Sequence, residues 1–364
     1  MTPEPVDPRV RQQAEEAMAA FDVPGLAIAY RQSDGPVSRV FIGADADGRS
    51  VDFDSLFPVA SLTKLGTALV VLQLVDRGEI DLAAPLSSFL PEANAARPGA
   101  TIRRLLSHAA GLPYDIDLTS LGRVAQVDWN RFARACLNCE LATPPGRQVQ
   151  YSNVGYGLLA LVVERHTRAS FRSVLAGRVL GPLGIEGYLG TEPPRPPMLI
   201  KDVRGAWVGT KSEQFTTPLW RSLGLPWGGL VTTLDGALAL VRAYRSSSPS
   251  FLSAPILSAA VSNQNGDLAG GFAPPLVWSK CWWGLGPDLH DQKNPHWAPA
   301  SSSRQTYGHA GAAGALAYLD PTLDLAWAII GTRTADNGWL VRGGPRIGEA
   351  IIESIRVRQA NGTE

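Results

Sequence analysis

Strand-like segments at both ends of this 364-residue chain constrain its fold more than any other feature of the sequence. Each end carries two short apolar runs separated by turn residues, which is the pattern of a β-hairpin. The four runs span residues 25–31, 37–43, 315–320 and 325–332, with turns at 33–36 and 320–324. We therefore predict an α/β fold of the α+β type, with one antiparallel sheet built from both chain ends and flanked by helices.

The chain between the two hairpins predicts an inserted, mainly helical lobe. Asp7 followed by Pro8 is a helix-start signal before residues 9–21, and the apolar spacing of residues 65–77 indicates a helix that Gly78 ends. Further helices are expected at residues 102–107, 129–136, 154–165, 234–245 and 348–357. We predict one domain over residues 1–364, with a sheet lobe formed by 1–64 and 300–364 and a helical lobe formed by 65–299.

The charge balance bears on the kind of partner this chain has. The formal net charge is zero at pH 7, so no basic field favours nucleic acid or an anionic membrane surface. The longest apolar stretch, residues 65–75, is too short to cross a bilayer. Residues 1–7 lack the basic and apolar regions of a secretory signal. We expect a cytoplasmic protein that acts on a small molecule, with no nucleic-acid or membrane partner.

Cysteine and histidine spacing gives no metal site. Three cysteines cannot all pair, and Cys136 and Cys139 lack a second pair that would complete a zinc site, so we expect unpaired structural thiols. His290 and His296 lie near Asp288 but match no metal-ligand spacing, so we interpret their surroundings as a polar surface insertion. We predict no metal and no cofactor.

Ser61-Leu62-Thr63-Lys64 places a hydroxyl and an amine on one face of a predicted helix start. A serine hydroxyl becomes a good nucleophile only when a base removes its proton, and a lysine is such a base only when its pKa is lowered. The positive end of the helix dipole disfavours the charged lysine and favours a developing oxyanion. Alone, the motif also fits a capping serine followed by a solvated lysine.

Two further motifs carry groups that suit the same chemistry. Tyr151 and Asn153 follow a turn and precede a helix, so both side chains can reach a cleft, where a phenol transfers protons and an amide binds a carbonyl and the lysine. His309-Ala310-Gly311 precedes the C-terminal hairpin, where glycine allows a substrate to approach a strand closely. A core tyrosine beside a helix cap and an ordinary glycine-rich turn are the alternative interpretations.

These three motifs, in this order, resemble the serine β-lactamase and penicillin-binding-protein superfamily, especially its class C β-lactamase, DD-peptidase and family VIII carboxylesterase branch. The resemblance covers nearly the whole chain and implies a β-lactamase/transpeptidase-like catalytic domain. Other segments that look like recurrent segments of the family span residues 56–64, 105–113, 144–146, 228–232 and 283–286.

The resemblance implies a role for each matching residue. Ser61 would be the acylated nucleophile, Lys64 its base and Tyr151 the proton shuttle to the leaving group. Asn153 would bind both the substrate and the lysine. Of the other histidines, His108 is expected to be a buried hydrogen-bonding residue rather than a catalyst.

The substrate edge departs from the pattern of the β-lactamases in one residue. His309 and Gly311 would line this edge, and the backbone N–H groups of Ser61 and Ala312 would form the oxyanion hole. The β-lactamases of the superfamily usually carry lysine at the position of His309, where it pairs with a substrate carboxylate. Because histidine is only partly charged near neutral pH, the sequence favours a neutral ester or amide over a β-lactam.

The sequence therefore predicts a serine hydrolase of the carboxylesterase kind that acts on a small ester or amide. One alternative is a transacylase that passes the acyl group to an alcohol or amine acceptor, and another is a DD-peptidase, β-lactamase or single-turnover penicillin-binding receptor. Specificity is expected to lie in residues 115–128 and 267–304, whose sequence does not identify the acyl group. Tryptophans in the second of these segments are candidates for an aromatic substrate wall: Trp278, Trp282, Trp283 and Trp297.

Overall fold

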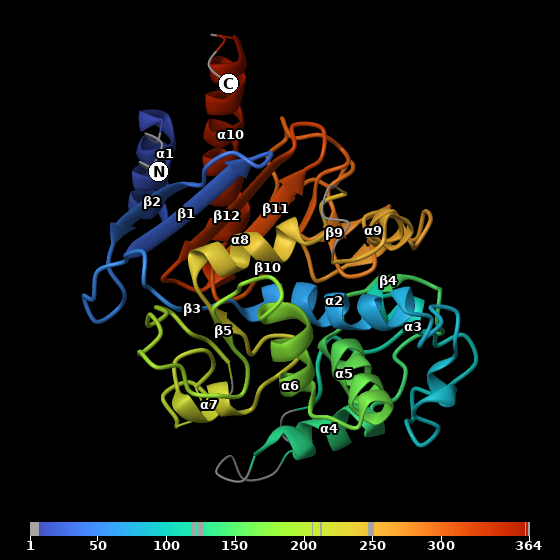
Figure 1. The fold of residues 1–364 in the computed structure, drawn as a ribbon. Coiled ribbons are helices and arrows are strands. Elements are labelled where there is room, and N and C mark those ends of the chain that lie inside the picture. The colour runs from blue at the N-terminus through green and yellow to red at the C-terminus, as the bar shows by residue number, and fades with distance from the viewer. Residues whose placement is uncertain are drawn as a thin grey trace.

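A six-stranded antiparallel sheet forms one half of the molecule (Figure 1). The computed structural model describes residues 7–117, 121, 127–205, 207–211, 213–246, 251–360 and 362. In spatial order the strands are β2 (Ser38–Gly43), β1 (Gly25–Gln32), β12 (Leu325–Gly331), β11 (Ala315–Asp320), β10 (Tyr307–Gly311) and β9 (Asp288–Leu289). β1 pairs with β12, so the N-terminal hairpin lies beside the C-terminal one. This confirms the predicted sheet built from both chain ends.

Side-chain size alternates along the central strands. The face of the sheet that meets α8 carries alanines at positions 27, 29, 317 and 328, whereas the face that meets α1 and α10 carries larger side chains such as Tyr30, Tyr318 and Trp327. Successive residues of a strand point to opposite faces, so this alternation shapes two different contact surfaces. Small residues let α8 lie close to one face, and large ones fill the space beneath the two terminal helices.

Each predicted helix is present. The helices are α1 (Pro8–Phe21), α2 (Thr63–Asp76), α3 (Ile102–Leu106), α4 (Trp129–Asn138), α5 (Asn153–Thr167), α6 (Phe171–Leu175), α7 (Pro218–Ser222), α8 (Leu234–Arg242), α9 (Ala254–Ala260) and α10 (Trp339–Ala360). Of these, α6, α7 and α9 lie in segments for which no helix was predicted. Two small three-stranded sheets join the loops. One consists of β3 (Phe57–Pro58), β6 (Val231–Thr232) and β5 (Gly187–Tyr188). The other consists of β4 (Val149–Gln150), β7 (Gly270–Gly271) and β8 (Val277–Trp278). α8 and β9 pack with the large sheet, although both come from the segment expected to form the helical lobe.

α10 begins nine residues before the start predicted at residue 348. Gly343, Gly344 and Pro345 disfavour a helix when only local propensity is considered. The structure shows why a glycine is present here: a Cβ at Gly344 would lie 2.7 Å from the Leu316 side chain on the sheet. Close packing of the helix on the sheet therefore overrides local propensity.

α2 lies between the large sheet and the other helices of the lower half (Figure 1). Every residue from Thr63 to Leu74 is buried, so the helix is apolar and enclosed on all sides. Its N-terminal end meets the end of β10, and this junction holds the Ser61 motif. Within the described residues, no helix is both long enough and apolar enough to span a membrane.

Candidate active site

Ser61 lies in a single 3-10 turn, Ala60–Leu62, which leads directly into α2. Ala60 has a φ of +44°, in the left-handed region that costs a residue with a Cβ about 1–2 kcal/mol. Gly311 at the end of β10 packs against this turn, because a Cβ there would lie 2.3 Å from Val59 O and 3.1 Å from Ser61 N. Only glycine therefore lets the strand approach the nucleophile turn this closely.

Lys64 is fully buried one turn after Ser61. Its Nζ atom lies 3.3 Å from Ser61 Oγ, 2.7 Å from Asn153 Oδ1 and 3.0 Å from the carbonyl oxygen of Trp227. Burial lowers the pKa of Lys64 well below its usual value of 10.5, and the charge of Asp115 opposes this shift only in part. Burial therefore favours the neutral form of the amine, which a base requires.

The contacts of Lys64 also decide where its lone pair points. A neutral amine has two N–H groups and one lone pair. Asn153 Oδ1 and the Trp227 carbonyl oxygen can only accept hydrogen bonds, so each takes one of the two N–H groups. The lone pair is left for the third neighbour, the Ser61 hydroxyl. This arrangement suits removal of the Ser61 proton.

Tyr151 lies next to Lys64, whose Nζ atom is 4.6 Å from the centre of the tyrosine ring. Its hydroxyl is buried and has no hydrogen-bond partner within the described part of the chain. Burial raises the pKa of Tyr151 well above 10, and the nearby Ser61 hydroxyl opposes that shift. A phenol kept protonated and unpartnered beside the nucleophile can give a proton to a leaving group.

Asn153 is the first residue of α5, and its side-chain amide connects Lys64 with Asp115. Oδ1 accepts from Lys64, while Nδ2 donates to Asp115 Oδ2 at 2.8 Å. Sequence reasoning singled out Asn153 but missed Asp115, which it included only as the start of a specificity loop. No local pattern marks Asp115, because its partner lies 38 residues away.

His309 lies in β10 with only 1% of its surface exposed. Its Nδ1 atom is 2.7 Å from the Ala310 carbonyl oxygen, which accepts the Nδ1–H, and Nε2 has no partner among the described residues. Burial is the largest cause that lowers the pKa of His309 to about 3. The ring is therefore neutral near pH 7, and its centre lies 5.8 Å from that of Tyr151.

A cleft of about 770 Å³ opens onto Ser61, and we call it the Ser61 cleft. Gly311, which was expected at the substrate edge, lines it together with Ala312, whereas His309, also expected there, is not among the described residues that do. Most of its wall is aromatic or apolar: Tyr114, Tyr151, Phe272, Pro274, Pro275, Leu276, Pro295, Trp297, Leu340 and Val341. Of the four tryptophans considered as a substrate wall, Trp297 lines the cleft and the other three do not. The cleft thus suits an apolar group next to the nucleophile.

His108 is buried, and its Nδ1 atom accepts a hydrogen bond from Ser152 N at 3.1 Å. The ring packs between Tyr151 and Trp283, at centre distances of 4.5 and 4.7 Å. This confirms the expectation of a buried hydrogen-bonding histidine.

The expectation of a polar surface insertion around His290 and His296 is wrong. Both rings are buried, and Asp288 lies 2.7 Å from His296 Nε2, accepts from Tyr318 Oη at 3.0 Å and forms an ion pair with Lys293. Polar groups can be buried when they satisfy one another, and the sequence alone does not reveal this pairing. Within the described ranges, no group of three or more metal-ligating side chains is placed to hold a metal ion.

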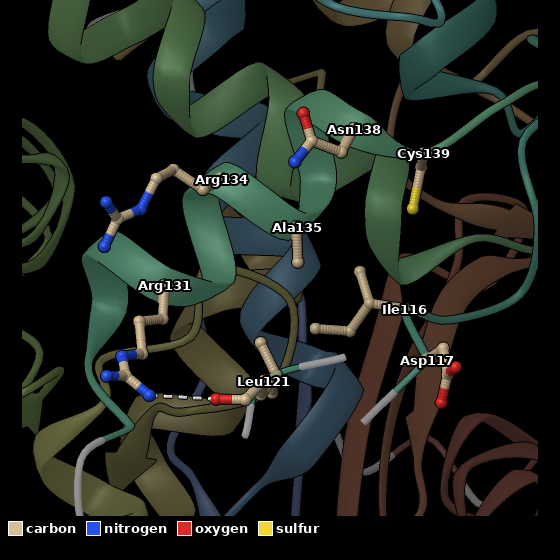
Figure 2. Close-up of a pocket in the computed structure, with 8 residues that line it drawn as sticks. All are labelled: Ile116, Asp117, Leu121, Arg131, Arg134, Ala135, Asn138 and Cys139. Carbon is tan, nitrogen blue, oxygen red and sulfur yellow. Dashed lines mark hydrogen bonds between the residues drawn. The ribbon is translucent and has the colours of Figure 1, made fainter. Parts of the chain in front are cut away.

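A second hollow, of about 570 Å³, lies against α4 and is shown in Figure 2. Arg131, Arg134 and Asn138 of α4 contribute to its wall together with Cys139. Burial raises the pKa of Cys139 to about 11, so its thiol is not a reactive thiolate at neutral pH. All three cysteines are free, as expected, and this hollow offers no activated nucleophile among its described residues.

The fold and the arrangement around Ser61 define an enzyme of the serine hydrolase type. The chain belongs to the Beta-lactamase family, whose model matches residues 10–350. This confirms the resemblance inferred from the motifs.

The names of individual relatives indicate different activities. The chain is 30% identical to penicillin-binding protein 4 of Amycolatopsis lactamdurans over 80% of this chain and 75% of that protein. It is 34% identical to the esterase EstB of Burkholderia gladioli over 46% of each chain. A penicillin-binding protein homologue from Caulobacter crescentus shares the fold, with a TM-score of 0.76, 23% identity, and coverage of 95% of this chain and 97% of that one.

Proposed function

We propose that this chain is a carboxylesterase-like hydrolase that cleaves small neutral esters through an acyl-enzyme on Ser61. The observation that carries the proposal is the environment of Lys64. This buried amine has both N–H groups engaged by pure acceptors and its third neighbour, Ser61 Oγ, at 3.3 Å. Such an arrangement prepares a base for one specific hydroxyl.

In the acylation step, Ser61 Oγ attacks the ester carbonyl carbon while its proton passes to Lys64 Nζ. The backbone N–H groups of Ser61 and Ala312 would stabilise the oxyanion, since Gly311 holds the end of β10 against the Ser61 turn. Tyr151 donates its proton to the departing alkoxide and recovers one from the Lys64 ammonium group. The products of this step are the alcohol and an ester on Ser61.

In the deacylation step, water attacks the Ser61 ester and its proton returns through the same groups to Ser61 Oγ. The carboxylic acid leaves and the starting enzyme is restored. An alcohol or amine that enters the cleft in place of water would take the acyl group instead. The same residues therefore serve a transacylase, and the product ratio distinguishes the two activities.

The lining of the Ser61 cleft supports a neutral ester rather than an anionic β-lactam. Its walls are mainly aromatic and apolar, Asp336 and Arg342 contribute opposite charges to the lining, and the neutral His309 supplies no positive charge for a substrate carboxylate. The curated relatives include an esterase and a penicillin-binding protein, so both substrate classes belong in the test.

The test compares p-nitrophenyl butyrate with benzylpenicillin at one pH and salt concentration. We expect many turnovers of the ester, an acyl adduct on Ser61 detectable by mass spectrometry, and a kcat/KM for the penicillin that is much lower. Methanol added to the reaction should yield mainly free butyrate if the enzyme is a hydrolase and methyl butyrate if it is a transacylase. A wild-type rate in the Ser61→Ala variant, or a single turnover of the ester, would refute the proposal.

A further inference from the structure

Asp115 is a carboxylate that reaches the catalytic centre through another side chain. Its Oδ2 atom accepts from Asn153 Nδ2 at 2.8 Å, and its Oδ1 atom accepts from the backbone N–H of Ile116 at 2.9 Å. Asn153 in turn accepts from Lys64, so Asp115 lies one side chain behind the base. The mechanism proposed above does not use it.

The chain builds this contact with a ladder of hydrogen bonds between two segments. His108 O accepts from Gln150 N at 2.8 Å, Pro113 O accepts from the Ser152 hydroxyl at 2.6 Å, and Tyr114 O accepts from Asn153 N at 2.7 Å. The segment from residue 108 to 114 therefore runs alongside residues 150–153. Asp115 follows the last of these bonds, which holds its carboxylate against the Asn153 side chain.

An asparagine amide can present either its oxygen or its nitrogen to a neighbour, and the two ends have opposite hydrogen-bonding character. An ionised carboxylate only accepts, so it binds the nitrogen end. With Nδ2 directed at Asp115, the oxygen end must face Lys64. A reversed amide would offer N–H groups to the lysine and would leave no acceptor there to direct its lone pair.

We propose that Asp115 is a positioning residue: by holding Asn153 Nδ2 it keeps Asn153 Oδ1 on Lys64 and so directs the lysine lone pair at Ser61. This inference rests on the proposed role of Lys64 as the base. It predicts two separable contributions, one from the acceptor oxygen of Asp115 and one from its charge.

The charge acts on the pKa of Lys64. The titratable side chains around the amine are Asp115, Tyr151, Tyr156, His108 and His309. Burial keeps both histidines neutral near pH 7 and both phenols protonated. Asp115 is the group among them that raises the pKa of Lys64, against the larger lowering that burial causes.

The experiment measures kcat, KM and the pH profile of kcat/KM on p-nitrophenyl butyrate. Asp115→Ala removes the acceptor, so kcat should fall about tenfold to hundredfold, up to the lower end of the roughly hundredfold to ten-thousandfold range of lost acid–base assistance, with little change in KM. In the Asn153→Ala background the same change should cost less than about twofold, because the amide that Asp115 orients is then absent.

Asp115→Asn removes the charge and keeps one acceptor oxygen, which can serve Asn153 Nδ2 or the Ile116 N–H but not both, so this variant tests the charge while keeping the contact only in part. The base works only when neutral, so activity rises with pH through the pKa of Lys64. Loss of the Asp115 charge lowers that pKa and should move the acid limb of the profile to lower pH by roughly half a unit to one unit. This variant also decides the matter if Asp115→Ala does not fold.

Asp45→Asn is the control, because Asp45 is a buried carboxylate that accepts from the backbone N–H groups of Asp47 and Arg49, pairs with the Arg49 side chain and does not line the Ser61 cleft. It should lower stability without moving the pH profile. The proposal is overturned if the Asp115 and Asn153 effects add independently, or if Asp115→Asn leaves the acid limb in place. Either result would leave ester turnover by the wild type intact, so it is distinguishable from failure of the proposed function.

Discussion

Two buried lysines of this protein have opposite surroundings. Lys64 is fully buried among neutral acceptors, namely an asparagine oxygen and a backbone carbonyl oxygen. Lys293 is 4% exposed and forms an ion pair with Asp288, while its Nζ atom also donates to Trp282 O at 2.7 Å. A buried amine next to a carboxylate is stabilised as a cation, whereas one without a carboxylate in contact is driven to the neutral form.

The difference separates a catalytic environment from a structural one. Lys293 neutralises Asp288, which His296 and Tyr318 also contact, and the ion pair lowers the pKa of Asp288 against the effect of burial. The Lys64 site instead keeps, close to Ser61, a desolvated amine and a phenol that has no hydrogen-bond partner among the described residues. Burial alone therefore does not identify a catalytic lysine, and the partner atoms decide its role.

The largest effect is expected from Lys64→Met. Loss of the base should lower kcat by about two to four orders of magnitude. The free energy of unfolding should change by no more than about 1 kcal/mol, because relief of the desolvated amine offsets the two acceptors left unpaired. Ester kinetics and urea unfolding measure the two quantities. A variant with a near-normal rate would remove Lys64 from the mechanism.

Lys293→Met should give the reverse result. It leaves Asp288 buried without its counter-ion, which typically costs about 3–5 kcal/mol of stability. The kcat of the folded fraction should stay near the wild-type value. Lys280→Met is the control, because Lys280 pairs with Asp267 at the surface and its loss should hardly move Tm. If Lys293→Met kept full stability and lost activity, the contrast between the two lysines would fail.

His309→Lys tests whether the charge missing from the substrate edge decides specificity. A charge-assisted hydrogen bond to a substrate carboxylate is worth about 1.5–3 kcal/mol, so the preference for anionic β-lactams over neutral esters should rise roughly tenfold to hundredfold. In the wild type the ratio should stay constant from pH 8 to pH 5, because a histidine with a pKa of about 3 remains neutral over that range. His309 is not among the described residues that line the Ser61 cleft, so a ratio that the variant leaves unchanged would show that the longer lysine side chain does not reach the substrate either.

Ala60→Gly is expected to have the smallest effect. Glycine adopts the φ of +44° at residue 60 without the Cβ strain, so stability should rise by up to about 1 kcal/mol, less the entropy that glycine loses on folding. The freer turn should hold Ser61 less precisely and lower kcat a few-fold with Lys64 in place. In the Lys64→Met background the same change should have little effect on the residual rate. Equal effects in both backgrounds would show that the strained turn at Ala60 does not act through Lys64.

Much of the fold could be predicted from the chain because the signals are local. The hairpins near each end combine apolar runs with turn residues. β1 and β12 pair with each other, as predicted for one sheet built from both chain ends. The glycine-rich start of α10 was missed because Gly344 and Gly348 serve contacts with Leu316 and Pro299, which only the folded chain brings near. Local propensity carries no information about such a contact.

The sequence by itself determined the order and spacing of the site residues, and hence the family. The i, i+3 spacing of Ser61 and Lys64 is a property of the backbone helix, so it is visible in the sequence. Tertiary structure alone decided the state of each group. Burial lowers the pKa of Lys64 because segments far along the chain enclose it, among them those of Asn153 and Trp227, 89 and 163 residues away. Desolvation and hydrogen bonding set a pKa, and both depend on which distant residues surround a side chain once the chain has folded.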